Sequence, residues 1–333
     1  MRMESIKDIL IIGGGPTGLF ASFYCGMRNA SCSIIDSLPT LGGQLATLYP
    51  EKYIYDVAGF PKIRAIELVK QLIQQSSESN PEVYLNESVQ ALDRRENGLF
   101  ELRTDKSIHF GRAVIICAGI GGFKPRPLPI DNANDYRNNG IYYFIDDLKK
   151  FENKKVLIVG GGDSAVDYAL MLSLTAQSVT LVHRRNEFRA HEESIRQLQN
   201  SSVRILTPFE LSSINGTNGV DEAIIVNNQN GDFMRLDIDV IVSGLGFSAS
   251  LGPIKDWGLE TFKNEIVVNS KMETNIPGVY AAGDIVTYPG KVKLIATGFG
   301  EAPTAVNNAI TFIRPNERLS PGHSSNRKEP VGS

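Results

Sequence analysis

Two short segments of the sequence place glycines at a spacing that can bind phosphate groups. They are Gly13-x-Gly15-x-x-Gly18 and Gly160-x-Gly162-x-x-Ala165. Each follows a short apolar run and precedes a helical pattern, so each is expected between a strand and a helix. In such a loop the first residue permits a tight turn, the second lets a pyrophosphate approach the backbone, and the third lets helix and strand pack closely. Both segments therefore predict dinucleotide-binding βαβ units.

The residue that ends the second strand differs between the two units. Asp36 holds this position in the first unit and His183 in the second, each 23 residues after the first glycine (36 − 13 and 183 − 160). A carboxylate can accept both hydroxyls of an adenosine ribose and repels a 2′-phosphate, whereas arginines beside His183 can bind that phosphate. We therefore assign FAD to the first loop and NADPH to the second. The predicted NADPH contacts are Gly160, Gly162, Ser164, Ala165, His183, Arg184, Arg185 and Arg189.

The cysteines offer no redox or metal motif. The chain has three, Cys25, Cys32 and Cys117, and no two of them have the CxxC spacing. No cluster of His and Cys suggests a metal site. Each lies in an apolar helix or strand pattern, where a cysteine is usually a small buried hydrophobic residue. We expect no metal and no thiol chemistry.

Composition limits the class of protein. The chain has 333 residues, 42% of them hydrophobic and 21% charged, which suits two globular domains. The net charge of −3 argues against a general nucleic-acid binder, which usually shows a basic excess. No apolar stretch has the length of a membrane span, and none near the first glycines resembles the apolar core of a signal peptide. We expect a cytoplasmic protein with no membrane or nucleic-acid partner.

The pattern of elements predicts an α/β protein with one domain inserted into another. The two βαβ units span about 7–36 and 155–183, and further helices are expected at 63–75 and 302–313. Apolar strands with little alternation are typical of parallel sheets that are covered on both faces. We predict a discontinuous FAD domain at 1–122 and 248–333, and an NADPH domain at 123–247.

Several ordered motifs resemble the low-molecular-weight thioredoxin reductases. These motifs are GGGPTGLFAS (13–22), GGQL (42–45), GGGDSAVDYA (160–169), HRRNEFRA (183–190) and NIPGVYAAGD (275–284). Those enzymes carry a redox CxxC in the NADPH domain, but residues 124–150 contain no cysteine. Tyr49 and a tail at 315–333 that contains His323 resemble instead the thioredoxin-reductase-like (type 2) ferredoxin–NADP⁺ reductases. The bacillithiol-disulfide reductase type has a cysteine where this chain has Thr17.

The resemblance implies a fold, a reaction and a set of cofactor contacts. It implies two Rossmann-like domains of the three-layer ββα type in a homodimer. Hydride passes from NADPH to FAD, and electrons then pass singly to ferredoxin or flavodoxin, with no acid–base residue. Tyr49 and His323 would cover opposite faces of the isoalloxazine. Together with the first glycine loop, the implied FAD contacts are Gly13, Gly15, Thr17, Gly18, Asp36, Gln44, Tyr49, Val89, Phe123, Asp284 and Ser325.

Two other functions remain open on the sequence alone. The first is an NADPH-dependent disulfide or quinone reductase, or an NADPH oxidase, and steady-state rates with each acceptor would distinguish these. The second is a non-catalytic redox sensor that binds flavin, for which NADPH would not reduce the flavin.

Overall fold

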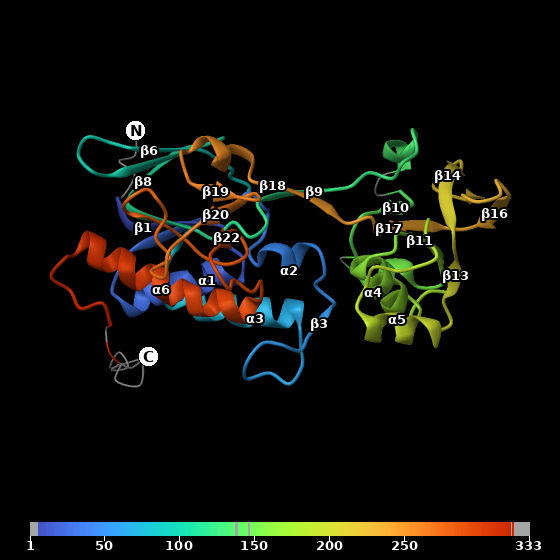
Figure 1. Cartoon of the computed structure of the whole chain (residues 1–333), viewed down its shortest axis with the longest axis horizontal. Helices are drawn as coiled ribbons and strands as arrows, with labels where there is room; N and C mark the ends of the chain where they lie inside the picture. Colours follow the sequence, from blue (N-terminus) through green and yellow to red (C-terminus); the bar gives the residue numbers. More distant parts are fainter. Residues whose placement is uncertain (1–5, 137–138, 146, 321, 323–333) are drawn as a thin grey trace. The chain divides into compact units, whose positions relative to one another are not determined.

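Two compact units make up the chain in the computed structural model (Figure 1). Unit 1 comprises residues 1–122 and 249–333, and unit 2 comprises residues 123–248. The structure describes residues 6–136, 139–145, 147–320 and 322. Unit 2 is thus inserted into the sequence of unit 1.

A seven-stranded sheet forms the centre of unit 1. Its order is β5-β2-β1-β8-β7-β6, and β21 also pairs with β8. Strand β8 belongs to two parts of this sheet: its last residues pair in parallel with β1 and β21, and its first residues pair antiparallel with β7. The strands are β1 (Lys7–Ile12), β2 (Cys32–Ile35), β5 (Glu82–Tyr84), β6 (Val89–Arg94), β7 (Phe100–Thr104), β8 (Ile108–Ile116) and β21 (Val279–Ala281).

Three helices pack together in unit 1: α1 (Pro16–Met27) contacts both α3 (Ala65–Ser77) and α6 (Ile295–Ile313). The apolar residues of β1 and β2 are buried because this helical layer covers the parallel strands, with which it shares one core. The smaller elements are α2 (Gly43–Thr47), β3 (Tyr53–Ile54), β4 (Ile63–Arg64), β19 (Thr261–Phe262), β20 (Glu265–Val267), β22 (Val286–Thr287) and the 3₁₀ helix η3 (Gly252–Asp256).

Unit 2 has a parallel sheet of order β10-β17-β11-β12-β13 and an antiparallel meander, β14-β15-β16. Alternate residues of β11 enter different cores: Val156 packs in the cluster that contains the α4 residues, and Leu157 in the cluster that contains the meander. The sheet therefore lies between helices and meander. The elements are β10 (Ile141–Tyr142), β11 (Lys155–Val159), β12 (Ser178–Val182), β13 (Arg204–Leu206), β14 (Phe209–Asn215), β15 (Glu222–Asn227), β16 (Phe233–Asp237), β17 (Val240–Ser243), α4 (Asp163–Leu172), α5 (Glu192–Gln199), η1 (Ala133–Tyr136) and η2 (Leu148–Phe151).

The connections between the units are β9 (Gly122–Pro125) and β18 (Phe247–Ser250), which pair with each other. Each unit repeats the same order of strand, glycine loop, helix and parallel strand. The predicted α/β class, with two Rossmann-like units, is confirmed.

Candidate dinucleotide-binding sites

The glycine loop of unit 1 lies between β1 and α1. Gly13 has φ +104°, and a Cβ there would lie 2.4 Å from the carbonyl oxygen of Cys117. A Cβ on Gly18 would lie 1.9 Å from the Gly13 oxygen. In contrast, a Cβ on Gly15 would meet only the Cα of Gly43, at 3.9 Å. Packing within the protein therefore requires the first and third glycines, whereas the space beside Gly15 is left for a ligand, as a pyrophosphate needs.

Asp36 directly follows β2 and is tied to this loop. Its Oδ2 accepts the backbone N–H of Gly14 at 2.6 Å, and its Oδ1 accepts that of Leu38 at 2.8 Å. Burial raises the pKa of the Asp36 carboxyl, while these two backbone hydrogen bonds act in the opposite direction. Each carboxylate oxygen can accept a further hydrogen bond. The geometry therefore suits the two hydroxyls of a ribose.

The Gly42–Gln44 segment lies against the same loop. Gly42 donates its N–H to the Gly14 oxygen at 2.8 Å. A Cβ on Gly119 would lie 3.2 Å from Nε2 of Gln44, so the amide reaches the segment that follows β8. The structure thus places Gly42 against the glycine loop and the Gln44 amide beside the end of β8.

Tyr49 and Asp284 are electrostatic neighbours. Burial, and then the negative charge of Asp284, raise the pKa of Tyr49 to about 12. Burial likewise raises the pKa of the Asp284 carboxyl. Tyr49 therefore presents a neutral ring at physiological pH.

Thr17 lies where three elements meet. Its Oγ1 would be 2.9 Å from a Cβ on Gly283 and 2.4 Å from one on Gly298. Gly283 follows β21, and Gly298 lies in the first turn of α6. The two glycines allow these elements to approach the N-terminus of α1. Asp284, the next residue after Gly283, is consequently held beside the glycine loop.

Val89, the first residue of β6, is buried. It lies two residues beyond Glu87, whose N–H donates to the Asp36 carbonyl at 2.9 Å. The structure therefore brings Val89 to the Asp36 end of the site. The Phe123 side chain, Ser325 and His323 lie outside the described residues.

The glycine loop of unit 2 has the same geometry. A Cβ on Gly160 (φ +152°) would lie 2.4 Å from the Gly244 oxygen, whereas one on Gly162 would meet only the Arg189 oxygen, at 3.7 Å. Ala165 is accommodated at the third position because the neighbouring Gly244 has no side chain. Ser164 lies in the first turn of α4. The second position is again open to a ligand.

The predicted basic residues line one cavity with this loop. The cavity has a volume of about 560 Å³, and His183, Arg184, Arg185 and Arg189 contribute to its wall. The Arg189 N–H donates to the Gly161 oxygen at 2.7 Å, which fastens this arginine to the loop. Burial lowers the pKa of His183, and the nearby arginines lower it further, so the arginines supply the positive charge.

The cavity is also lined by residues that we did not predict, among them Arg126, Glu210 and Gly244. Gly244 follows β17, which pairs with β11, and the corresponding turn in unit 1 is Cys117–Gly119 after β8, which pairs with β1. The oxygens of Gly244 and Cys117 take the same place beside Gly160 and Gly13. The repeated position of this turn, after the strand that neighbours each glycine-loop strand, was a signal from which Gly244 could have been predicted. No motif marks Arg126 or Glu210.

A family model described as pyridine nucleotide-disulphide oxidoreductase matches residues 7–309. The chain belongs to this family. Proteins similar to this chain include the ferredoxin–NADP reductase of Halalkalibacterium halodurans, which is 58% identical over 97% of this chain and 98% of its own length. The ferredoxin–NADP reductase of Geobacillus thermodenitrificans is 55% identical over 97% of both chains. These relatives confirm the resemblance predicted from the sequence.

The thioredoxin reductase of Lactococcus lactis is a structural relative within the same fold. It superimposes with a TM-score of 0.78 at 25% identity, and the match covers 93% of this chain and 99% of that one.

The name of the family refers to disulphides, but all three cysteines of the present protein are buried as free thiols. Burial raises the pKa of the Cys117 thiol well above its usual range, which makes it unreactive.

Among the residues that the structure describes, no group of three or more His, Cys, Asp or Glu side chains could hold a metal ion. No helix among these residues is long and apolar enough to cross a membrane.

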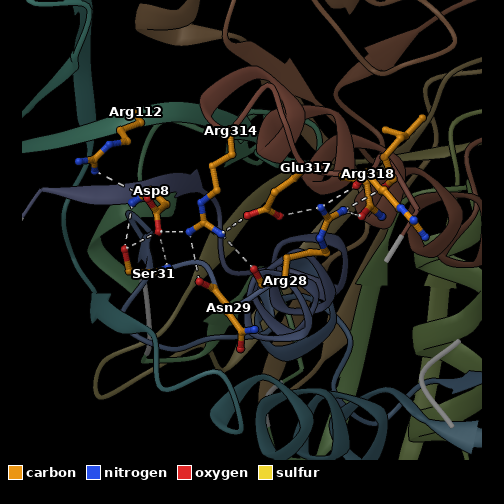
Figure 2. Close-up of polar contacts among 10 residues, drawn as sticks. Asp8, Arg28, Asn29, Ser31, Arg112, Arg314, Glu317 and Arg318 are labelled. Atoms are coloured by element: carbon orange, nitrogen blue, oxygen red, sulfur yellow. Dashed lines mark hydrogen bonds and ion pairs between the residues drawn. The ribbon is translucent and has the colours of Figure 1, made fainter. Parts of the chain in front are cut away.

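The start of the C-terminal tail is fixed by two arginines (Figure 2). Arg28, at the end of α1, donates to the carbonyls of Arg318 and Leu319 at 2.9 Å and to Glu317 at 3.2 Å. Arg314 donates to Asp8 at 3.0 Å and to Glu317 at 3.2 Å. The Arg28 side chain is only 4% exposed. Residues 317–319 are therefore held against the end of α1.

Proposed function

We propose that this protein is an FAD-dependent ferredoxin–NADP⁺ reductase, which passes electrons between NADPH and ferredoxin or flavodoxin. One observation carries most of the proposal: the curated relatives of that name match almost the whole chain at 55–58% identity. The two glycine loops, one beside a carboxylate and one beside arginines, supply the two nucleotide sites that such an enzyme needs.

FAD binds in unit 1 along the first glycine loop. The pyrophosphate lies beside Gly15, at the N-terminus of α1, whose free N–H groups favour negative charge. The Asp36 carboxylate accepts the ribose hydroxyls, and Gln44, Tyr49 and Asp284 contact the flavin half. When bound, FAD accepts hydride and releases electrons singly. The protein itself binds and orients, and no acid–base residue is needed.

NADPH binds in unit 2 in the cavity beside Gly162. The guanidinium groups of Arg184, Arg185 and Arg189 bind the 2′-phosphate, because an arginine can donate two parallel charge-assisted hydrogen bonds to a phosphate. His183 remains neutral and stacks on Phe188, with ring centroids 5.4 Å apart. This stacking orients the segment that carries the arginines.

A disulfide as the internal acceptor is disfavoured by the buried, free state of the three cysteines. Ferredoxin or flavodoxin is then the acceptor of the electrons of the reduced flavin.

We further infer that the protein is a homodimer, because it resembles the type 2 enzymes. We infer a cytoplasmic location, because free cysteines suit a reducing compartment. Light scattering and cell fractionation test these two inferences.

Anaerobic titration of the purified yellow protein with NADPH is the decisive experiment. We expect the flavin absorbance to bleach with NADPH and to return when oxidised ferredoxin or flavodoxin is added. NADPH-dependent reduction of quinones or disulfides at higher rates would favour the other reductase functions. Failure of NADPH to bleach the flavin would favour a redox sensor.

A further inference from the structure

A buried ion pair lies next to the proposed flavin site in unit 1. The Nζ of Lys291 is 2.5 Å from Oε1 of Glu301, and the two side chains are 4% and 5% exposed. The Tyr288 hydroxyl donates to the same Oε1 at 2.7 Å. Burying two charges is unfavourable unless their hydrogen bonds are satisfied, so such a pair needs a specific reason.

The sequence builds this pair from a turn and a helix. Residues 288–291 form a β-turn in which Lys291 donates its N–H to the Tyr288 oxygen at 3.0 Å. Pro289 and Gly290, with φ +83° at the glycine, are the residues that favour such a turn. The turn brings the first and fourth side chains together on Glu301 of α6.

The second oxygen of Glu301 holds the backbone of the flavin site. Its Oε2 accepts the N–H of Gly283 at 2.7 Å. Gly283 has φ +86° and directly precedes Asp284, so this hydrogen bond fixes the turn that presents the Asp284 carboxylate. Gly298, one helical turn before Glu301, lies against Thr17. Glu301 therefore joins α6 to the same turn that Thr17 contacts.

The charges of Lys291 and Glu301 also shift the pKa of the Asp284 carboxyl in opposite directions. After burial, which raises the Asp284 pKa most, Lys291 lowers that pKa and Glu301 raises it. The lysine thus offsets the repulsion that the glutamate alone would exert on its neighbouring carboxylate.

We propose that Glu301, paired with Lys291, is a positioning residue for FAD that acts through the Gly283 N–H to hold the Asp284 carboxylate against the cofactor. The proposal rests on the location of FAD proposed above. It concerns binding and geometry, so it can be tested without measuring turnover.

A double-mutant cycle on the apoprotein tests whether Glu301 acts through Asp284. FAD affinity is measured by the quenching of flavin fluorescence for wild type, Glu301→Gln, Asp284→Ala and the double variant. We expect Glu301→Gln to weaken FAD binding about 10- to 100-fold, in line with one charge-assisted hydrogen bond. In the Asp284→Ala background the same change should have little further effect, because the group that Glu301 positions is absent.

Two further variants separate positioning from general damage. Adding Lys291→Met to Glu301→Gln removes the unpaired buried ammonium while the amide oxygen can still accept the Gly283 N–H. This variant should recover most of the FAD affinity. If Glu301→Gln does not fold, the cycle uses Glu301→Leu together with Lys291→Met, which removes both buried charges and also the acceptor of the Gly283 N–H. Asp93→Asn breaks an exposed pair elsewhere in unit 1, with Arg103 at 2.7 Å, and should leave FAD affinity at the wild-type value.

The outcomes distinguish this proposal from the assignment of the FAD site. If Asp284→Ala weakens FAD binding but the two changes add independently, Glu301 does not act through Asp284 and only the present proposal is wrong. If Asp284→Ala binds FAD as wild type does, the site assignment and the present proposal are both wrong. Recovery by Lys291→Met, together with non-additivity, supports the proposal.

Discussion

The guanidinium of Arg184 lies 4.0 Å from the carboxylate of Glu210, in the wall of the cavity that the unit 2 glycine loop lines. Both side chains are more than half exposed, so the attraction between them is weak. Arg184 is therefore available to bind a 2′-phosphate, whereas the neighbouring Glu210 carboxylate would repel that phosphate. This arrangement gives two predictions with opposite signs.

Replacing Arg184 with alanine should weaken NADPH binding about 10- to 150-fold, because it removes charge-assisted hydrogen bonds of roughly 1.5–3 kcal/mol. Binding of NADH, which lacks the 2′-phosphate, should be nearly unaffected. Titration of the oxidised enzyme with NADP⁺ and NAD⁺ measures the ratio. Equal losses for both coenzymes would show that Arg184 does not bind the phosphate.

Replacing Glu210 with glutamine should strengthen NADPH binding about 1.5- to 5-fold, the range expected for one exposed charge interaction. The gain should shrink as salt is added, because exposed charges are screened. Glu222→Gln is the matched control, since Glu222 pairs with Arg235 in the meander, with a separation of 3.2 Å. A gain that is equal in the two variants would reflect net charge and not the site.

Two glycines of the first loop should respond differently to alanine. Gly18→Ala brings a methyl group to 1.9 Å from the Gly13 oxygen, and should lower the free energy of unfolding of the apoprotein by at least about 1–3 kcal/mol. Gly15→Ala has room in the protein and changes only the N-cap residue of α1, so it should cost less stability than Gly18→Ala while weakening FAD binding. Thermal unfolding and FAD titration of both apoproteins test this contrast. An apoprotein destabilised equally by both changes would contradict it.

A variant without Cys25, Cys32 and Cys117 should still transfer electrons from NADPH to ferredoxin. The three thiols are buried, and their replacement by alanine should reduce stability because packing contacts are lost. Stopped-flow flavin reduction and ferredoxin reduction are the measurements. Loss of transfer in a folded variant that retains FAD would revive the disulfide reductase hypothesis.

The role of the tail can be separated from its anchoring by two truncations. Cutting after Arg314 removes three of the groups that Arg28 contacts, at Glu317, Arg318 and Leu319, and should lower the free energy of unfolding by about 1–3 kcal/mol. Cutting after Ser320 keeps these groups and should leave stability unchanged. Both truncations remove His323. We therefore expect both to retain FAD, shift the flavin spectrum and alter ferredoxin reduction more than hydride uptake. A spectrum and ferredoxin kinetics that stay unchanged in both would show that the tail does not cover the flavin.

Local patterns were enough to predict the strand, loop and helix of each proposed nucleotide site, but not the long-range partners of these elements. The glycine loops, Asp36 and the arginines are readable because strand, turn and helix follow one another in the sequence. The helix predicted at 302–313 begins at Ile295 in the structure. Gly298, Gly300 and Pro303 disfavour a helix locally. Gly298 is nevertheless required there, because any side chain would collide with Thr17. Tertiary packing outweighs helix propensity at this point.

The networks of Glu301 and Arg28 illustrate what the sequence did not reveal. Glu301 meets Lys291 and Gly283, and Arg28 meets residues 317–319, which lie almost 300 positions away in the sequence. A single glutamate in an apolar helix, or an arginine at a helix end, carries no spacing that predicts such partners. Only the folded chain brings these groups together.

The paired connections β9 and β18 have a consequence for how this architecture can be rearranged. Gly121 and Ser250 are neighbours, since a Cβ on Gly121 would lie 2.2 Å from the Ser250 oxygen, and Arg126 donates to the Gly246 oxygen at 3.0 Å. The chain thus leaves unit 1 and re-enters it at adjacent points, and the same holds for unit 2. A short splice could close either unit on itself without stretching the backbone. Such a junction allows one nucleotide module to be exchanged as a cassette while the other keeps its own fold.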